Sequence, residues 1–426
     1  MKTIASAAAF LLLAASAAEA QVRIEISGAN FRPLPIAAPA PLVQAGANGA
    51  AAAFDSALVF DLTAAGIFQF LDRKGYLADP GEAFTAGGIR FQRWSDIGAE
   101  ALVKTQLSMD AGQLRVRAKL FSVASGREEL EINHAGPLEQ PRQLAHHVAD
   151  ALYRHFTREP GPFQSHLAFV KRNGTSREVW LSDWDGENAK RISNGGLNVL
   201  PVVLPDGQGV AFTSYRGGKP DVYIQRPAAN PTALVRAGAM ATGVAFSADG
   251  KRIAWAQSSG QGTQIWVAQA DGSGGRAITD TPFFINSSPS WSPDGRQLAF
   301  VSDRAGSPQI YVMNADGTGV RRLTFQGNYN QTPDWSPRGD LIAFTARDER
   351  NAFDLFTIDV GTGKITRLTQ DQGNNEEPAF SPNGRLIVFT STRAGGSQLM
   401  VMTYDGRNQL PLPVARGHYL TPDWGP

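Results

Sequence analysis

The chain has 426 residues, of which 42% are hydrophobic and 19% charged, and its formal net charge is +1 at pH 7. That length is sufficient for two domains, and the balanced charge argues against nucleic acid or an anionic membrane surface as the partner. The chain contains no cysteine, which excludes disulfide bonds, thiolate metal sites and a cysteine nucleophile.

The first twenty residues have the pattern of an export signal. Lys2 precedes an apolar run from Ile4 to Ala18, and Ala18-Glu19-Ala20 has the small-residue spacing of a cleavage site. The run is shorter than the ~20 apolar residues that a membrane-spanning helix needs. We therefore predict cleavage after Ala20, a mature chain that starts at Gln21, and export in soluble form. An uncleaved N-terminal anchor is the alternative.

The start of the mature chain is predicted to be a short strand followed by a loop. Val22, Ile24 and Ile26 alternate with Arg23 and Glu25, which is the period-two pattern of a strand. Residues 32–53 are rich in Pro, Ala and Gly, and this composition predicts a loop.

Two helices and a hairpin are predicted between residues 54 and 157. Residues 54–65 place apolar side chains on one helical face, and Gly66 ends the helix. Residues 101–108 and 113–122 form the arms of a hairpin, and residues 141–156 carry an apolar stripe at helical spacing. We predict a small α+β domain over residues 34–157 and a linker at residues 158–162.

From residue 163 onward the sequence repeats. The glycine of an S-P-D-G-like turn recurs at spacings of 43, 45, 44 and 45 residues, at Gly207, Gly250, Gly295, Gly339 and Gly384. A period near 44 matches one four-stranded propeller blade. The glycine-histidine and tryptophan-aspartate pairs of WD40 blades do not recur at fixed positions, which argues against that class of propeller.

Residues 289–325 show how one blade is built. Ser292-Pro293-Asp294-Gly295 is a turn in which proline presets φ and glycine takes a positive φ. Three further strands are predicted at residues 297–302, 309–313 and 320–324. The large side chains Trp291, Trp335 and Phe380 are expected to pack sheet against sheet and not to stack on nucleic acid.

The two ends of the repeat region are predicted to pair. The first repeat lacks an opening strand, and Thr421–Pro426 at the C-terminus repeats the pattern of Thr332–Pro337. We predict that this last strand completes the first blade. The expected fold is an α+β N-terminal domain followed by an all-β six-bladed β-propeller over residues 163–426.

The sequence offers little for catalysis. No serine sits on the G-x-S-x-G elbow of a prolyl-oligopeptidase-type enzyme, and no H-E-x-x-H zinc motif is present. His147 and His155 are expected on an exposed helix face and not in a metal site. One alternative stays open, a propeller hydrolase or lactonase with a metal in the channel near Glu376, Glu377 and Asp334. Otherwise we predict no catalytic residue, no metal site and no cofactor.

The order of these features resembles one family. An exported chain, an α+β domain that contains V-F-D-L-T-A-A-G-I-F-Q-F-L-D, and blades of the form P-x-W-S-P-D-G-x-x-[LI]-[AV]-F are similar to the TolB family, the propeller proteins of the Tol-Pal cell-envelope system of Gram-negative bacteria. The resemblance covers the whole mature chain, whereas the blade motif alone is shared with other propellers. It implies a monomeric periplasmic adaptor, not an enzyme, that supports outer-membrane integrity and cell division.

The resemblance also implies partners. It implies binding to the lipoprotein Pal through the propeller and to TolA through the mature N-terminus. Other outer-membrane proteins and toxins are further implied partners, without nucleic acid and without insertion into a membrane. TolA would bind within residues 21–33, on the strand Gln21, Val22, Arg23, Ile24, Glu25 and Ile26. Such a strand can add to the edge of a partner's sheet; the alternative is a fixed edge strand of the small domain.

Pal would bind at one mouth of the channel, on the loops that join the last strand of one blade to the first strand of the next. These loops are polar with a few aromatic residues, which suits a reversible interface. The loop at residues 237–244 lacks a histidine that some relatives carry there. The candidate contacts are Asn198, Ser287, Asn330, Gln331, Thr332, Glu376, Glu377, His418 and Tyr419.

Overall fold

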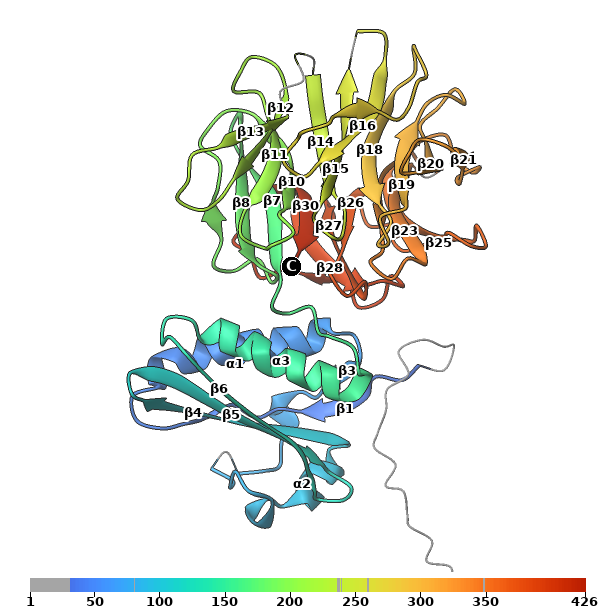
Figure 1. The fold of residues 1–426 in the computed structure, drawn as a ribbon. Helices are drawn as coiled ribbons and strands as arrows, with labels where there is room; N and C mark the ends of the chain where they lie inside the picture. The colour runs from blue at the N-terminus through green and yellow to red at the C-terminus, as the bar shows by residue number, and fades with distance from the viewer. Residues whose placement is uncertain (1–30, 80, 236–237, 239, 259, 348) are drawn as a thin grey trace, which may run out of the picture.

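The structure, a computed structural model, consists of a small helix-and-sheet part stacked against a larger ring of sheets (Figure 1). It describes residues 31–426 apart from 80, 236, 237, 239, 259 and 348. The predicted leader and the predicted strand at residues 21–26 lie outside the described residues. In the part of the chain that is described, no helix is long and apolar enough to cross a membrane.

The small part is one mixed sheet with helices packed against it. Its strand order is β3-β1-β4-β5-β6, with β2 also paired to β4. β1 runs parallel to both β3 and β4, whereas β4, β5 and β6 are antiparallel. The elements are β1 (Leu34–Ala37), β2 (Leu42–Val43), α1 (Asn48–Ala64), β3 (Phe68–Phe70), η1 (Arg73–Gly75), η2 (Ala86–Gly88), α2 (Phe91–Asp96), β4 (Ala101–Asp110), β5 (Gln113–Ser122), β6 (Glu128–Gly136) and α3 (Pro141–Thr157).

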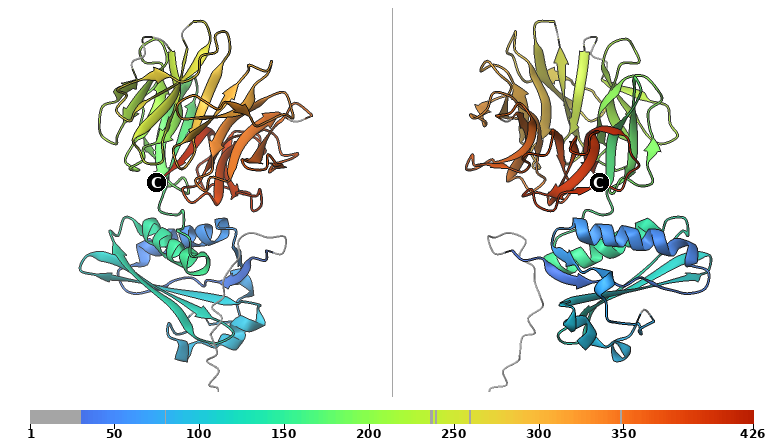
Figure 2. Two further views of the ribbon diagram at one scale, coloured as in Figure 1. Left: turned by 45° about the vertical axis from the view of Figure 1, so that its right-hand side comes forward. Right: turned by 180° about the vertical axis from the view of Figure 1, so that it is seen from behind.

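Two long helices separate this sheet from the propeller. α1 and α3 pack side by side on the face of the sheet that looks toward the propeller (Figures 1 and 2). α3 buries the apolar stripe that its spacing predicts, and this stripe consists of Leu144, Val148, Leu152 and Phe156. The helices therefore carry the residues that meet the propeller.

The segment at residues 32–53 was wrongly predicted as a loop. It contains β1 and β2, and α1 begins at Asn48 and not at Phe54. Leu34–Ala37 is buried throughout because β1 lies between β3 and β4. The run of alanines before Phe54 extends the helix, since alanine has the highest helix propensity of all residues.

The predicted hairpin is present as β4 and β5. The two strands pair antiparallel from Ala101 opposite Ser122 to Asp110 opposite Gln113. Ala111 and Gly112 have φ values of +49° and +79°, as a two-residue hairpin turn requires.

The larger part is a propeller of six four-stranded antiparallel sheets around a channel (Figure 1). The predicted fold class is therefore confirmed. We number the blades in chain order and give the strands of each from the channel outward. Blade one is β30 (His418–Gly425), β7 (His166–Asn173), β8 (Ser176–Asp183), β9 (Lys190–Arg191); blade two is β10 (Asn198–Val203), β11 (Val210–Ser214), β12 (Asp221–Gln225), β13 (Thr232–Val235); blade three is β14 (Met240–Phe246), β15 (Arg252–Ser258), β16 (Thr263–Gln269), β17 (Arg276–Ala277); blade four is β18 (Asn286–Trp291), β19 (Gln297–Ser302), β20 (Gln309–Asn314), β21 (Arg321–Arg322); blade five is β22 (Asn330–Trp335), β23 (Leu341–Arg347), β24 (Phe353–Asp359), β25 (Ile365–Arg367); and blade six is β26 (Asn375–Phe380), β27 (Leu386–Ser391), β28 (Gln398–Thr403), β29 (Leu410–Pro411).

The C-terminal strand closes the ring as predicted. β30 pairs antiparallel with β7, from His418 opposite Arg172 to Gly425 opposite His166. The indole N–H of Trp424 donates to the Ser165 hydroxyl at 2.7 Å, which ties the end of the chain to the segment before β7. The first blade is thus assembled from both ends of the repeat region.

The repeated turn has the predicted geometry. Gly295 has a φ of +67°, and its N–H donates to the Ser292 carbonyl at 2.9 Å. The Asp294 carboxylate accepts from the Ser292 hydroxyl at 2.7 Å and from the Arg296 N–H at 3.0 Å. Asp294 is therefore a turn residue.

Each channel-lining strand contains a β-bulge. The pairing register of all six strands shifts at the same place, where two residues oppose one on the neighbouring strand. The first bulge residue has a positive φ in every blade, and proline follows it in all blades except blade three. Proline suits this position because the hydrogen-bond ladder between the two strands is interrupted there, so no backbone N–H is needed. The six bulge residues are Leu200, Gly243, Ser288, Thr332, Glu377 and Thr421.

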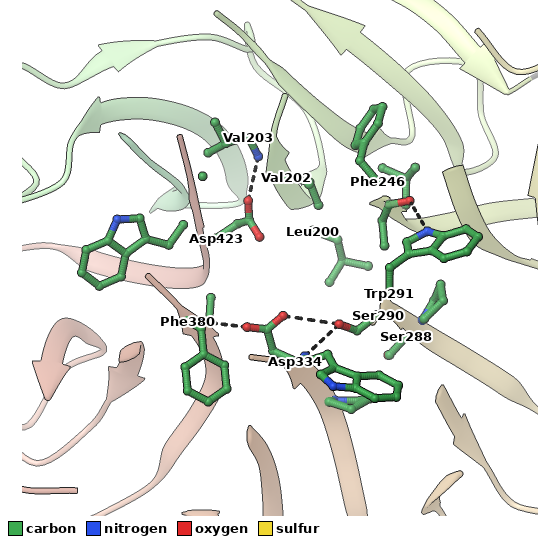
Figure 3. A pocket seen from close by; sticks show the side chains of 18 of the residues that line it. Leu200, Val202, Val203, Phe246, Ser288, Ser290, Trp291, Asp334, Phe380 and Asp423 are labelled. Carbon is green, nitrogen blue, oxygen red and sulfur yellow. Dashed lines mark hydrogen bonds between the residues drawn. The ribbon is translucent and has the colours of Figure 1, made fainter. Parts of the chain in front are cut away.

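Side chains next to the bulges join neighbouring blades. The Asp423 carboxylate accepts from the Val203 N–H at 2.7 Å, and Asp334 accepts from the Phe380 N–H at 2.7 Å (Figure 3). Burial in the channel wall raises the pKa of Asp334 to about 7 and that of Asp423 to about 6. These two carboxyl groups connect the inner strands around the ring.

The two parts share one continuous hydrophobic cluster. It runs from the core of the small domain, through Trp184, into the sheets of blades one and six. Trp184 is fully buried and stacks on Phe60 from α1 at 5.3 Å and on Trp424 from β30 at 5.7 Å. The connecting segment is also held, because Glu159 forms an ion pair with Arg385 at 2.5 Å. The small domain is therefore packed against the propeller and not merely tethered to it.

The histidines of α3 are less exposed than predicted. His155 is 8% exposed and its Nε2 lies 3.2 Å from a Glu129 carboxylate oxygen of β6. His146 is 2% exposed and contacts Asp61 of α1. Among the three histidines of α3, only His147 is partly exposed. The prediction of a histidine-bearing exposed face failed because the propeller and β6 cover this helix.

We predict that replacing Trp184 with alanine uncouples the two parts. Loss of this buried indole removes about 3–5 kcal/mol of stability. We expect two separate unfolding transitions by calorimetry and faster proteolysis at residues 158–162. Trp255→Ala is the matched control, because Trp255 is equally buried but lies within blade three. A Trp184→Ala protein with one transition and an uncleaved linker would contradict the prediction.

We also predict that Asp334 and Asp423, two of the carboxyl groups in the channel wall, make the propeller more stable at acidic than at alkaline pH. Their pKa values are about 7 and 6 in the folded state and ~4 in the unfolded chain. Between these values the folded state binds protons that the unfolded state has released, so stability falls as pH rises. Because Asp334 and Asp423 are both partly exposed to the channel, we discount the effect to about 1–2 kcal/mol between pH 5 and pH 8.

The measurement is denaturant unfolding at several pH values. Asp334→Asn/Asp423→Asn should flatten the dependence, since the amide oxygen can still accept the two backbone N–H groups. An equally steep dependence in the double variant would show that other groups cause it.

Candidate functional site

The candidate site is the propeller channel together with one of its two mouths. The channel holds a cavity of about 470 Å³ that is lined by the inner strands of all six blades (Figure 3). Three carboxyl groups, those of Asp334, Glu377 and Asp423, face it among mostly apolar neighbours. The wall is therefore apolar with a few polar groups, which is the usual character of a binding cavity.

Glu377 lies at the bulge of blade six. Its carboxylate accepts from the Thr421 N–H at 2.5 Å, and its own N–H donates to the Thr345 hydroxyl at 3.0 Å. Burial raises the pKa of Glu377 to about 7, and burial also raises the pKa of Glu376. Both glutamates lie close to the mouth that the blade-to-blade loops form. A partner that covers this mouth would therefore change their charge.

The small domain and the connecting segment pack against the other end of the propeller, at blades one, five and six. The Asn383 side chain and Arg338, both in turns that follow inner strands, contact Pro160 and Glu159 of the connecting segment. The inner strands end at that side and start at the other. The mouth at their starting ends, formed by the blade-to-blade loops, therefore faces away from the small domain (Figure 1).

The open mouth has an apolar rim. The described residues expose twelve large apolar side chains, and eight of them lie in the blade-to-blade loops or next to them. Phe283 and Phe325 are the most exposed, at 80% and 72%. Exposed apolar groups gathered on one face indicate an interaction surface. We define the apolar rim as Leu197, Leu200, Tyr215, Met240, Phe283, Phe284, Ile285 and Phe325.

The backbone holds the main part of this rim in place. The Phe283 N–H donates to the Gln261 carbonyl at 2.5 Å, and the Phe284 carbonyl accepts from the Thr263 N–H at 3.0 Å. The Arg322 guanidinium lies over the Phe325 ring at 5.1 Å. A rim that is fixed before binding loses little conformational freedom when a partner arrives.

Arginines recur beside the rim. A Ser-x-Arg sequence after the second strand places the guanidinium Nε on the serine hydroxyl at 3.3, 2.9 and 2.8 Å in blades two, four and six. Burial lowers the pKa of Arg304 and of Arg393. The motif is visible in the sequence at Ser214–Arg216, Ser302–Arg304 and Ser391–Arg393, so the repeat of these arginines could have been predicted.

Three of the predicted contact residues lie inside the blades. Asn198 and Asn330 are 1% and 2% exposed, and their side-chain amides donate to the Gly195 carbonyl at 2.7 Å and to the Gln309 side chain at 2.8 Å. The Tyr419 ring is 4% exposed, and its hydroxyl donates to the Ala415 carbonyl at 2.6 Å. These side chains shape the loops and are not available to a partner, so we leave them out of the proposed contact surface.

The other predicted residues lie near the open mouth. Thr332 and Glu377 are bulge residues that line the cavity. Ser287, Gln331 and Glu376 precede bulge residues and are partly exposed, and His418 at the start of β30 is exposed. The apolar rim was missed, although consecutive apolar residues in a loop, such as Phe283-Phe284-Ile285, could have indicated it.

Comparison with known proteins gives the same architecture. Residues 22–129 match the TolB amino-terminal domain, and residues 153–426 match the TolB beta propeller domain. The Tol-Pal system protein TolB of Myxococcus xanthus is 62% identical over 100% of this chain and 99% of its own length. That of Anaeromyxobacter dehalogenans strain 2CP-C is 46% identical over 99% of this chain and 98% of its own length.

A solved structure agrees with this result. The crystal structure of TolB from Acinetobacter baumannii superposes with a TM-score of 0.80 at 26% identity, over 95% of this chain and 100% of that one. The alternative of a propeller hydrolase or lactonase is therefore set aside. The chain belongs to the TolB family and is a periplasmic, non-enzymatic component of the Tol-Pal system.

Proposed function

We propose that the chain is an adaptor that binds the lipoprotein Pal at the open mouth of the propeller and TolA through residues 21–33. Residues 34–157 carry the N-terminal segment, residues 158–162 join the two parts, and residues 163–426 form the Pal-binding propeller. The adaptor acts as a monomer, supports outer-membrane integrity and cell division, and is a surface that toxins and other outer-membrane proteins can use. The single observation that supports this proposal best is the apolar rim.

The rim fits a protein partner. Interfaces of this kind depend on a few large apolar or aromatic anchors surrounded by polar groups. Phe283 and Phe325 are the anchors here, and Ser287, Gln331 and His418 are partly or fully exposed polar residues at the starting ends of inner strands around the same mouth. Below the bulge residues, in the half of the channel toward the small domain, the inner strands line a cavity of about 470 Å³.

The N-terminal segment leaves the structure close to the propeller. The Arg407 guanidinium of blade six lies over the Phe31 ring at 4.6 Å, and Phe31 packs against the shared hydrophobic cluster. Arg32 forms an exposed ion pair with Glu100 at 3.3 Å. A partner that shifts blade six could therefore displace Phe31, and this contact is a physical route for coupling between the two partner sites.

We expect the two anchors to dominate Pal binding. Phe283→Ala and Phe325→Ala should each weaken binding of lipid-free Pal about 10- to 30-fold, because truncating an anchor costs about 2 kcal/mol. The measurement is isothermal titration calorimetry with the mature protein. Val320→Ala is the control, because Val320 is 40% exposed but lies in a turn away from the open mouth. Equal affinities in all variants, or an effect of Val320→Ala alone, would refute binding at this mouth.

We expect the TolA site to be separable from the Pal site. A chain that starts at Leu34, the first residue of β1, should lose binding to the partner domain of TolA and keep its affinity for Pal within about threefold. Both titrations are made on the same preparations, with circular dichroism to confirm folding. Retained TolA binding by the shortened chain would place the TolA site elsewhere.

A further inference from the structure

The junction of the two parts holds a buried polar cluster that the proposed function does not use. It lies between α3 of the small domain and the turn that follows β8 in blade one. That turn reads Asp183-Trp184-Asp185, and Trp184 is the residue that fills the domain interface. The cluster therefore contains groups from both parts of the protein.

A carboxylate orients the central histidine. The Nδ1 atom of His146 lies 2.7 Å from one carboxylate oxygen of Asp61, and the other oxygen accepts from the Trp184 indole N–H at 3.1 Å. Asp61 has no N–H or O–H to offer when ionised, so Nδ1 carries the proton. The lone pair of a neutral His146 is then on Nε2. A carboxylate that fixes an imidazole in this way is the common outer-shell arrangement of metal-binding histidines.

The other imidazole nitrogen is buried and has no hydrogen-bond partner. His146 is 2% exposed, and its Nε2 atom is among the few buried side-chain nitrogens of the described residues without such a partner. It points toward a carboxylate oxygen of Asp185 at 3.6 Å. A buried polar atom that is left unpaired costs stability, and its presence requires an explanation.

Two carboxylates surround this nitrogen. Ligand atoms of His146, Asp183 and Asp185 all lie within 4.8 Å of one another. A cavity of about 210 Å³ borders His146 and Asp183 and is also lined by His147 and His166. The cavity can deliver an ion and can hold a water molecule as a further ligand.

The charges of the cluster do not balance. Asp61, Asp183 and Asp185 are three carboxylates, and among the described residues Arg142 is the guanidinium that pairs with them, through Asp185. Asp150 of α3 adds to the negative potential at Asp61. Asp61 and Asp185 are buried and Asp183 is partly exposed. The excess is two negative charges when His146 is neutral and one when it is protonated, a form that the nearby carboxylates favour by raising the pKa of His146. A divalent cation would neutralise this excess.

We propose that this cluster is a binding site for a divalent transition metal of the zinc class, with His146 Nε2 and the carboxylates of Asp183 and Asp185 as ligands. Imidazole nitrogen and carboxylate oxygen are ligands that Zn²⁺ accepts, and water from the cavity completes the coordination. Asp61 is a positioning residue that sets the tautomer. The ion joins α3 to blade one and so fixes the small domain on the propeller.

The first test is titration of metal-free full-length mature protein with Zn²⁺ by calorimetry. We expect one ion per chain, and a Co²⁺ or zinc X-ray absorption spectrum with one imidazole and carboxylate oxygens in the first shell. His146→Gln and Asp183→Asn should each weaken zinc binding at least 100-fold. Asp61→Asn should weaken it 10- to 100-fold, because it removes the carboxylate that sets the tautomer.

The controls are two other histidines. The rings of His134 and His147 lie edge to face with their centroids 4.0 Å apart, and this pair could hold an ion by itself. His134→Gln and His147→Gln should leave the zinc affinity within about threefold of wild type. Loss of binding in these variants but not in His146→Gln would overturn the proposal, as would a wild-type protein that takes up no stoichiometric zinc.

A measurement on the wild type covers the case in which His146→Gln does not fold. Zinc should shift the ¹⁵N resonance of His146 Nε2 in protein labelled at histidine, and should raise the melting temperature of the protein. If His146 carries protons on both nitrogens and its resonances do not change with zinc, the cluster is an ion-pair network and the proposal is wrong.

Discussion

Pairing of β30 with β7 is the interaction on which the rest of the structure depends. It joins the first and last strands of the repeat region into one sheet, so the ring is closed between the first and the last blade. The same pairing places Trp424 against Trp184, and Trp184 is the residue through which the small domain packs on the ring. Ring closure and domain contact therefore use the same buried surface, and disturbing one should weaken the other.

The closed ring also explains why the channel has two different ends. Each inner strand contains a bulge, and the strands are tied to their neighbours by Asp423 and Asp334. The small domain packs against one end, and the other end presents loops whose backbone is hydrogen-bonded and whose apolar side chains are exposed. A rigid scaffold that presents adaptable loops is the usual arrangement for a binding protein.

Much of the fold could be predicted, because it is encoded locally. The recurring turn glycines and the C-terminal copy of Thr332–Pro337 are sufficient to predict six blades and their closure. The bulges were not predicted. Strands are predicted from the alternation of apolar and polar residues, and a single residue with a positive φ before a proline cannot be recognised from that alternation. The prediction of a loop before Phe54 was wrong. The proline and glycine residues of this segment favoured a loop, but the segment contains the buried parallel strand β1.

The candidate site was less predictable than the fold. Asn198 and Asn330 look like loop residues in the sequence, but they are buried because their amides complete hydrogen bonds of the blade. The cluster around His146 could not be foreseen at all. Its members come from α1, α3 and the turn after β8, and only the packing of the two parts brings them together.

The central claim is that the open mouth of the propeller binds Pal and that this binding alters hydrogen exchange in the N-terminal segment. Hydrogen–deuterium exchange of the mature protein, with and without lipid-free Pal, tests both parts at once. The account predicts slower exchange in residues 193–201, 280–289 and 325–333 when Pal is bound, and altered exchange in residues 21–33. Protection of the turns on the side of the small domain, with no change at these loops, would contradict it.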